Sequence, residues 1–567
     1  MGSVVDTRQP VRRIAVALTA LAVWAGCPGS APAAPAQGRQ DPPVVWEDCP
    51  QGSLTGLPKD VAPALMRCAT YAVPLDHAHP EGGTVPLALM KRSAKDPGKR
   101  IGSILTNFGG PGTAGWGAPV VAEYFFSPAV LERFDVVAFD PRGVGRSMPL
   151  RCYTSQQQFD TVDAKLMRDP VTPQQLTDEA DALRIQGDLC RDNAGPLLAH
   201  MSTAVVARDL DLLRQAVGDD RLTYFGVSYG TFLGDTYANM FPDKVRAIVN
   251  TGNTDPALRS SDGTRYEHDR ALNYEDVLGA VLERCKKAGA PICPFGDGDP
   301  QAKFGAIRDY LRAHADTAVT TADGTSVTLN SFVNDLYGSL PDAATYHALA
   351  KRWQALYDAL PPGSGAGSAR PRTADTPFTG NNANPAVNCS DMPYPRDVNG
   401  LAGLAETWEK DAPTFGRPQV FNGLNQCSTW PYTPAPDDDV YRGPWNTYTG
   451  VAPILLVNAL HDPATPYSYA QNAARELGPA TRLLTVDAFG HGSISPAESA
   501  CVARHITTYL LTTTAPDPDT TCTDVAQPFD TRTVTNNNQG LGVPASRSSV
   551  WPVSMPSVRA LSGLRGH

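Results

Sequence analysis

The sequence predicts an α/β fold in which helices cover both faces of a mostly parallel β-sheet. Three observations lead to this prediction. In the first half of the chain, short apolar runs that end at glycine-rich turns alternate with helical patterns, as in repeated strand–helix units. A long, mainly helical segment interrupts this alternation, which resumes near residue 453. With 567 residues, the chain is also longer than one hydrophobic core usually organises, which indicates a large insertion.

Six apolar runs have the composition of buried strands, because each is short, rich in aliphatic and aromatic residues, and followed by turn residues. Two helices are expected between these strands. One is capped by Ser202 or Thr203 and continues to about residue 217. The other spans residues 231–241 and is ended by Pro242. The six expected strands are residues 101–107, 134–140, 222–227, 245–250, 453–458 and 482–486.

The segment between the fourth and fifth expected strands is mainly helical. It contains an apolar stripe with the spacing i, i+4, i+7 and i+11, which lies on one helix face and is expected to pack in a core. A stretch rich in Pro, Gly, Ser and Ala at residues 361–384 is expected to be a loop. The residues of the stripe are Leu349, Trp353, Leu356 and Leu360.

Residues 1–36 have the features of an export signal that is removed after transport. Basic residues precede an apolar run at 14–26, and two A-x-A stretches of small residues follow it. The run is shorter than the about 20 apolar residues that a membrane-spanning helix needs. We therefore expect a secreted protein without stable membrane association. A lipoprotein that is anchored through Cys27 is the alternative.

These observations predict a single domain with a large insertion. The mature chain begins with a core domain, which the helical segment divides into two parts, and it ends in a polar tail. The expected parts are the export signal (1–36), the first part of the core domain (37–256), the helical cap or lid (257–445), the second part of the core domain (446–522) and the tail (523–567).

The cysteine count agrees with export. Removal of the signal takes Cys27 with it and leaves ten of the 11 cysteines, and an even number in an exported protein indicates disulfide bonds. None of the ten belongs to a C-x-x-C pair, and no neighbouring histidine completes a zinc motif, so we expect no metal site. Many pairings are compatible with the sequence. We expect consecutive cysteines to pair, because each pair then closes a local loop.

The charge balance excludes one broad class of function. The chain has 48 basic and 58 acidic residues, for a net charge of −10. A nucleic-acid-binding protein instead presents a basic surface to the phosphates, so we expect no nucleic-acid partner. With 42% hydrophobic and 19% charged residues, the chain has the composition of a globular protein, which we expect to be a monomer.

Residues 226–230 (GVSYG) match the G-x-S-x-G motif. They lie between an expected strand and an expected helix, as the nucleophile elbow of an α/β-hydrolase does. The two glycines permit the sharp turn that exposes the serine Oγ, and the helix N-terminus favours the negative charge that develops there. Ser228 is therefore the candidate nucleophile.

A serine nucleophile needs a general base and a residue that orients the base. In α/β-hydrolases these residues follow the serine in the order Asp, His, on loops after two later strands. Asp462 follows the fifth expected strand, and His491 lies in a Gly-His-Gly turn after the sixth. We therefore expect Ser228, Asp462 and His491 to form a catalytic triad. His461 is a rival base, for which we expect a structural role.

The same architecture needs two backbone N–H groups that stabilise the oxyanion of the tetrahedral intermediate. The amide of Tyr229, next to the nucleophile, is expected to be one of them. The other is expected in the glycine-rich turn that follows the first strand. Because Pro111 has no N–H, Gly110 is the first choice there and Gly109 the second.

This glycine-rich turn also supports a competing hypothesis. Residues 110–115 are formally G-x-G-x-x-G and, with Asp140 at the end of a later strand, they have the pattern of a dinucleotide-binding site. However, Pro111 removes one phosphate donor from this loop, and an exported protein has little access to such a cofactor. We therefore expect that the protein uses no cofactor.

Taken together, seven motifs resemble those of the secreted tripeptidyl aminopeptidases of Streptomyces, which are α/β-hydrolases related to the proline iminopeptidases. The resemblance extends over about residues 45–522. Three departures from the family are Phe108, where the iminopeptidases carry His, residues 250–256 (NTGNTDP), where an Asp-Gly pair is expected, and the tail past Cys522, which is longer than expected. The motifs are residues 107–112 (NFGGPG), 140–147 (DPRGVGRS), 228–231 (SYGT), 386–391 (AVNCSD), 427–431 (CSTWP), 462–466 (DPATP) and 490–493 (GHGS).

The resemblance implies a serine exopeptidase that releases short peptides, tripeptides among them, from the free N-termini of peptides or proteins. Such an enzyme needs a closed pocket, for which the helical cap is the natural lid, and a carboxylate that binds the substrate's ammonium group. Candidates for this carboxylate are Asp391, Glu275 and Glu283. A secreted esterase or lipase is the first alternative, because the same machinery cleaves esters. A catalytically silent binding protein is the second.

Overall fold

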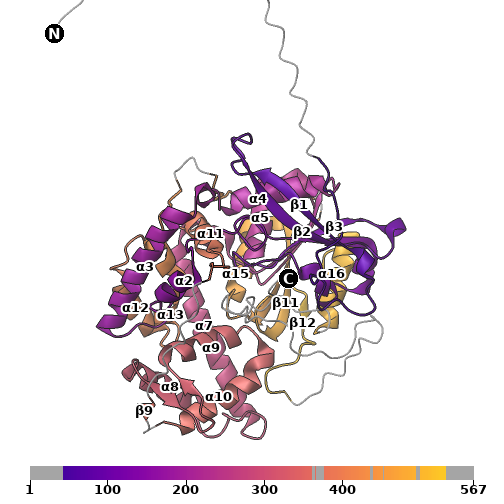
Figure 1. Ribbon diagram of the computed structural model, residues 1–567. Coiled ribbons are helices and arrows are strands. Elements are labelled where there is room, and N and C mark those ends of the chain that lie inside the picture. Colours follow the sequence, from indigo (N-terminus) through magenta and orange to yellow (C-terminus); the bar gives the residue numbers. More distant parts are fainter. Residues whose placement is uncertain are drawn as a thin grey trace, which may run out of the picture. The chain divides into compact units, whose positions relative to one another are not determined.

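The computed structural model describes residues 42–360, 364–365, 376–434, 439–450, 452–492 and 498–530 (Figure 1). The expected export signal and the part of the tail from residue 531 onward lie outside these ranges. Within them, no helix has both the length and the apolar character that crossing a bilayer requires.

In the described part of the chain, the main sheet has nine strands in the order β1-β2-β4-β3-β5-β6-β10-β11-β12. The strands from β4 to β12 in this order are parallel, and β1 and β2 add an antiparallel edge, so the sheet is mostly parallel, as predicted. The strands are β1 (Met66–Pro74), β2 (Thr84–Arg92), β3 (Gly102–Asn107), β4 (Phe134–Phe139), β5 (Leu222–Val227), β6 (Val245–Thr251), β10 (Ile454–His461), β11 (Thr481–Phe489) and β12 (Thr521–Cys522).

All six predicted strands are present, but β1, β2 and β12 are not among the predictions. Strands β1 and β2 contain partly exposed or exposed residues between buried ones, so neither forms the continuous apolar run that indicates a strand buried on both faces. Strand β12 has only two residues and pairs with β11 at the other edge of the sheet. A prediction that relied on apolar runs therefore missed these strands, which lie at or next to the edges of the sheet.

Helices cover both faces of the sheet, because alternate side chains of each strand point to opposite faces. On one face, Leu105 belongs to a large hydrophobic cluster, in which residues of α4 (Thr203–Ala216), α5 (Tyr229–Met240) and α15 (Tyr467–Leu477) take part among others. On the other face, Ile104 belongs to a second cluster with two helices. The two helices on this second face are α1 (Pro128–Arg133) and α16 (Ala500–Thr512).

The two helices predicted in the first half are α4 and α5. The side chain of Ser202 caps α4 by accepting a hydrogen bond from the amide of Val205. Helix α5 begins at Tyr229, two residues earlier than predicted, because the turn residue Ser228 leads directly into it.

The chain between β6 and β10 is mainly helical and forms the cap, part of which lies in the lower half of Figure 1. A small sheet in the order β8-β7-β9 joins its helices. The elements are α6 (Pro256–Ser261), α7 (Gly263–Ala288), α8 (Pro300–Ala313), β7 (Ala318–Thr320), β8 (Ser326–Val327), α9 (Leu329–Ser339), α10 (Tyr346–Asp358), β9 (Ser364–Gly365), α11 (Ala383–Asp391), α12 (Leu401–Asp411), α13 (Gly416–Gln419) and α14 (Asn425–Ser428), with a π-helical turn at Val420–Leu424.

The apolar stripe lies on α10, where Leu349, Trp353 and Leu356 are buried in the core of the cap, as predicted. Leu360 follows the end of this helix and is half-buried against the same core. The segment 361–384, which we expected to be a loop, contains β9 and the first residues of α11. Helix α3 (Pro173–Asn193) precedes the insertion in sequence but also contacts the cap, where Asn425 donates a hydrogen bond to Glu179 over 2.9 Å.

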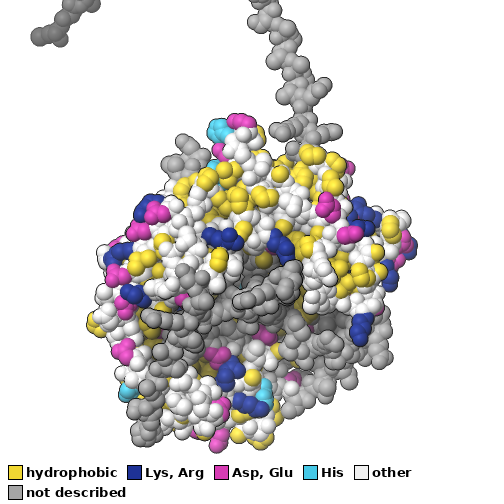
Figure 2. Space-filling view, in the orientation of Figure 1, with side chains coloured by type: hydrophobic (Ala, Val, Ile, Leu, Met, Phe, Trp, Pro, Cys, Tyr) yellow, Lys and Arg dark blue, Asp and Glu magenta, His cyan; other side chains and the backbone are white. Residues whose placement is uncertain are grey.

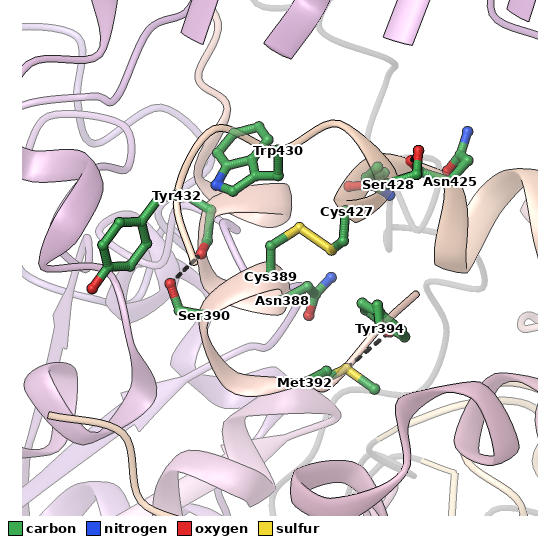
Figure 3. The surroundings of a disulfide bond; sticks show 12 residues. Asn388, Cys389, Ser390, Met392, Tyr394, Asn425, Cys427, Ser428, Trp430 and Tyr432 are labelled. Carbon is green, nitrogen blue, oxygen red and sulfur yellow. Dashed lines mark hydrogen bonds between the residues drawn. A yellow bond between two sulfur atoms is a disulfide. The ribbon is translucent and has the colours of Figure 1, made fainter. Parts of the chain in front are cut away.

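Five disulfide bonds join consecutive cysteines, which confirms the expected pairing. The Cys389–Cys427 bond connects α11 to α14 inside the cap (Figure 3). His505 lies beside Cys501 and Cys522, but these two sulfur atoms are bonded to each other and are therefore not available as thiolates for a metal ion. The pairs are Cys49–Cys68, Cys152–Cys190, Cys285–Cys293, Cys389–Cys427 and Cys501–Cys522.

Charged side chains of both signs are interspersed over the face shown in Figure 2. On the described surface of this face, the basic side chains do not form the continuous stripe that a phosphate backbone requires. This distribution agrees with the acidic net charge of the chain.

Candidate active site

Ser228 occupies the sharp turn between β5 and α5. Its backbone angles, φ 58° and ψ −124°, are unusual for a residue with a side chain, and such strain is a feature of the nucleophile elbow. A Cβ atom on Gly226 would lie 2.5 Å from the carbonyl oxygen of Gly230, so the turn requires glycine there. Ser228 is partly exposed while its neighbours Val227 and Tyr229 are buried. The turn therefore presents this serine to the surroundings.

Asp462 and His491 follow the neighbouring strands β10 and β11 and lie in direct contact. The Nδ1 atom of His491 is 2.9 Å from Oδ2 and 3.0 Å from Oδ1 of Asp462. Asp462 is buried, with 1% of its surface exposed, whereas His491 is partly exposed. A buried carboxylate at Nδ1 sets the imidazole tautomer and leaves Nε2 able to accept a proton.

The loop after β10 surrounds the carboxylate of Asp462 with hydrogen-bond donors. The amides of Ala464 and Thr465 donate to Oδ1 over 2.9 and 2.8 Å. The hydroxyl of Thr465 donates to Oδ2 over 2.8 Å and also lies 3.1 Å from Nδ1 of His491. Thr465 was not predicted as a site residue. Its only signal in the sequence is its place in the D-P-A-T-P motif, three residues after the aspartate.

The histidine loop packs against the elbow. The Thr251 hydroxyl at the end of β6 donates to the carbonyl of Gly492 over 2.9 Å, and the Thr251 carbonyl accepts the amide of Ser228 over 3.0 Å. A Cβ atom on Gly492 would lie 3.0 Å from the Val227 side chain. Three loops at the carboxyl ends of β5, β10 and β11 thus bring Ser228, Asp462 and His491 to one edge of the sheet.

Two other histidines, His461 and His505, have different surroundings from His491. The ring of His461 stacks on Phe489, with 4.1 Å between the ring centroids. Burial, and next the nearby Arg284, lower the pKa of His461, which favours its neutral form. His505 is half-buried on α16, beside the Cys501–Cys522 disulfide.

The glycine-rich turn after β3 passes close to the elbow. A Cβ atom on Gly109 would lie 2.9 Å from Cβ of Ser228, so only glycine permits this approach, and both Gly109 and Gly110 have positive φ angles. The amide of Gly109 donates to the side-chain oxygen of Asn107 over 2.9 Å. The amide of Tyr229 is the first in α5 and has no acceptor within that helix.

The same turn lacks the features of a dinucleotide site. After residues 110–115 the chain continues into turns and a short 3₁₀ helix at Ala118–Tyr124, so no α-helix N-terminus follows directly. Asp140 is buried and accepts hydrogen bonds from the amides of Trp116 and Arg146 over 2.9 and 2.8 Å. Its carboxylate therefore stabilises the conformation of the surrounding loops.

The three carboxylates that we considered for substrate binding lie apart. Glu283 is exposed on α7. Glu275 accepts hydrogen bonds from the amide and hydroxyl of Thr414, both 2.8 Å, and from a second amide. Asp391 is buried and accepts from the amide and hydroxyl of Thr203 over 2.9 and 2.5 Å, and burial raises its pKa. Glu275 and Asp391 thus stabilise the packing of the cap, and Asp391 is connected through the Thr203 hydroxyl to the side chain of Tyr229, next to the nucleophile.

Comparisons with known proteins identify relatives. Residues 107–281 match the family model described as alpha/beta hydrolase fold, as predicted, and residues 412–522 match the model described as TAP-like protein. The serine protease Hip1 of Mycobacterium tuberculosis is 30% identical over 498 residues, which cover 85% of this chain and 91% of that protein. The tripeptidyl aminopeptidase of Streptomyces coelicolor is 29% identical over 508 residues, which cover 86% of this chain and 87% of that protein. Carboxylesterase B of Mycobacterium tuberculosis is 31% identical over 483 residues, which cover 80% of this chain and 86% of that protein.

Proposed function

Because this chain belongs to the α/β-hydrolase family that includes the serine protease Hip1 and the Streptomyces tripeptidyl aminopeptidases, we propose that it is a secreted serine exopeptidase. The enzyme releases short peptides, tripeptides among them, from the free N-termini of peptides or proteins. The observation that carries the proposal is the 2.9 Å contact between His491 Nδ1 and Asp462, at the sheet edge where the strained Ser228 directly precedes α5. The catalytic triad of an α/β-hydrolase consists of these three groups in this chain order.

Catalysis then proceeds through an acyl-enzyme. Ser228 Oγ attacks the scissile carbonyl carbon while Nε2 of His491 accepts the hydroxyl proton. His491 next donates this proton to the leaving amine, and a water molecule, activated by the same imidazole, releases the acyl group from the serine. Asp462 accepts the Nδ1–H of His491 and stabilises the imidazolium that forms in each step.

The oxyanion of each tetrahedral intermediate needs two backbone donors. In the proposed mechanism the amides of Tyr229 and Gly110 supply them. Since the amide of Gly109 already donates to Asn107, Gly110 is preferred to its neighbour. The N-terminal end of α5 adds a favourable dipole at the same place.

A free N-terminus also requires a negative partner for the substrate's ammonium group. Of the three predicted carboxylates, Asp391 is the best placed, because the Thr203 hydroxyl that it binds lies 2.6 Å from the hydroxyl of Tyr229. The two hydrogen bonds from Thr203 leave acceptor sites on the Asp391 carboxylate, because an ionised carboxylate has about four lone-pair sites. Glu275 is hydrogen-bonded to Thr414 inside the cap, and Glu283 is exposed. We therefore assign neither residue to substrate binding.

A secreted esterase is the second candidate function, and one observation favours it. Carboxylesterase B, a relative as similar as the peptidases, has 31% identity to this chain. The triad and oxyanion donors serve esters and amides alike, so the fold does not separate the two activities.

A panel of chromogenic substrates separates these functions. It contains mono-, di- and tripeptides with free amino termini, the same peptides with blocked amino termini, and a short-chain ester. The exopeptidase proposal predicts that free tripeptides are cleaved and that blocked ones are cleaved much more slowly. Equal cleavage of free and blocked peptides would remove the exopeptidase claim, and hydrolysis of the ester alone would favour the esterase.

The nucleophile is tested by Ser228→Ala. We expect this variant to lose both fluorophosphonate labelling and hydrolysis of every cleaved substrate, because the covalent step needs the hydroxyl. Its thermal unfolding should remain close to that of the wild type. Persistent labelling of the variant would show that another residue is the nucleophile.

A further inference from the structure

Cap helix α7 contacts the main chain of the loop that carries Asp462. The side-chain amide of Asn273 donates two hydrogen bonds, one to the carbonyl of Asp462 over 2.7 Å and one to that of Pro463 over 2.9 Å. One turn earlier on α7, Nε of Arg270 donates to the carbonyl of Ala464 over 3.0 Å. Residues i and i+3 share a helix face, so one face of α7 binds three consecutive carbonyls of this loop.

The two sides of the loop have different partners. Its amides at residues 464 and 465 donate to the carboxylate of Asp462, and its carbonyls at residues 462–464 accept from α7. Rotation of the loop away from the cap would therefore break its three hydrogen bonds to α7. Asn273 contributes two of these bonds from a single planar amide, which also restricts the twist of the peptide between Asp462 and Pro463.

The donors on α7 are themselves held in place. Arg270 forms an ion pair with Glu267 over 2.7 Å, and Glu267 has only 3% of its surface exposed. Glu267 also accepts a hydrogen bond from the hydroxyl of Tyr394 over 2.8 Å and one from the amide of Gln419. The cap thus presents a rigid face to the Asp462 loop.

The cap also contacts the loop of the general base. The carbonyl of Pro341, in the turn between α9 and α10, accepts the backbone amide of His491 over 2.8 Å. Two separate parts of the insertion therefore bind the two loops that carry the base and its orienting residue.

We propose that Asn273 is a positioning residue for Asp462, and that the cap is in this way part of the catalytic apparatus as well as a cover over it. This inference rests on the proposed triad. Asn273 touches neither the substrate nor the reacting atoms in this mechanism. It acts by keeping the Asp462 carboxylate in line with Nδ1 of His491, where a displacement of about 1 Å can cost on the order of a hundredfold in rate.

The test compares three variants of α7. Asn273→Ala removes both donors, and Asn273→Gln keeps an amide on a longer side chain. Asp276→Asn changes an exposed residue one turn further along the same helix, and this residue forms no hydrogen bond or ion pair in the described structure. Because Asn273 is only partly buried, water can solvate the two carbonyls in Asn273→Ala, and we expect this variant to fold. Asn273→Ser is the second variant if the alanine variant does not fold.

The readouts are kcat, KM and the pH profile of kcat/KM, measured with an ester substrate that needs the triad whatever the natural substrate is. We expect Asn273→Ala to lower kcat by about tenfold or more while KM stays within about twofold. The acidic limb of the profile should move to lower pH, because a displaced Asp462 stabilises the His491 imidazolium less. Asn273→Gln should recover part of kcat, and Asp276→Asn should match the wild type.

Two outcomes would overturn the inference. One is an Asn273→Ala variant with wild-type kcat and an unmoved acidic limb. The other is a loss of kcat that follows only the loss of folded protein, with the pH profile unchanged. Failure of the proposed function looks different, because the wild type itself would then hydrolyse no ester or peptide and would not be labelled at Ser228.

Discussion

Glu179 is a buried carboxyl group that the proposed mechanism does not use. It has 1% of its surface exposed, and it accepts hydrogen bonds from the Met167 amide over 2.6 Å and the Asn425 side chain over 2.9 Å. Burial raises its pKa from 4.5 to about 7. Between these two values the folded protein binds more protons than the unfolded chain, so the contribution of Glu179 to stability decreases as the pH rises.

Glu179→Gln tests this pH dependence. Glutamine has the same shape without the charge, and its amide can donate to the side-chain oxygen of Asn425, which has no partner in the described structure, if the Asn425 amide turns over. We expect the variant to exceed the wild type in stability by up to about 3 kcal/mol above pH 7, and to equal it below pH 4.5. Urea unfolding at several pH values measures the difference. A difference in stability between the two proteins that does not change with pH would contradict the raised pKa of Glu179.

At the scale of elements, disulfide bonds hold the short helices of the cap. Figure 3 shows the Cys389–Cys427 bond between α11 and α14, among Met392, Tyr394 and Trp430. Helix α14 has four residues, so its place depends on packing and on this covalent bond more than on its own hydrogen bonds. Through α11, the bond also holds the helix that carries Asp391.

The length of the loop that each bond closes predicts its contribution to stability. Cys389–Cys427 spans 38 residues and Cys285–Cys293 spans 8. Loop-closure entropy gives about 4 kcal/mol for the first bond and about 2.5 kcal/mol for the second. Replacing both cysteines of each pair by alanine, followed by urea unfolding, tests this order. Equal losses for the two double variants would show that strain or residual structure outweighs loop length.

At the scale of the whole molecule, the ten paired cysteines support an extracytoplasmic location, because disulfide bonds persist where the surroundings are oxidising. We expect the exported protein to begin near Gln37, after the second A-x-A stretch. N-terminal sequencing of protein from the culture medium checks this. Cys27→Ala is the matched control: it should leave export and processing unchanged, whereas retention of the wild type in the membrane through Cys27 would favour the lipoprotein alternative.

Local pattern in the sequence was sufficient for the central strands, the elbow at Ser228 and the positions of Asp462 and His491, because buried parallel strands are continuous apolar runs and the chemistry follows their carboxyl ends. It was not sufficient for β1 and β2, whose alternating exposure depends on their place at a sheet edge. It also missed Thr465, since one threonine in a loop has no periodicity to distinguish it.

Long-range contacts were decided by the tertiary structure alone. Asn273 lies 189 residues before Asp462, and its role depends on how a cap helix packs on a loop of the core. Likewise, Asp391 and Glu275 are candidate substrate ligands by residue type, and only the tertiary structure shows that they accept hydrogen bonds from Thr203 and Thr414. Residue type and spacing specify which chemistry is available, whereas packing between distant segments decides which group is free to perform it.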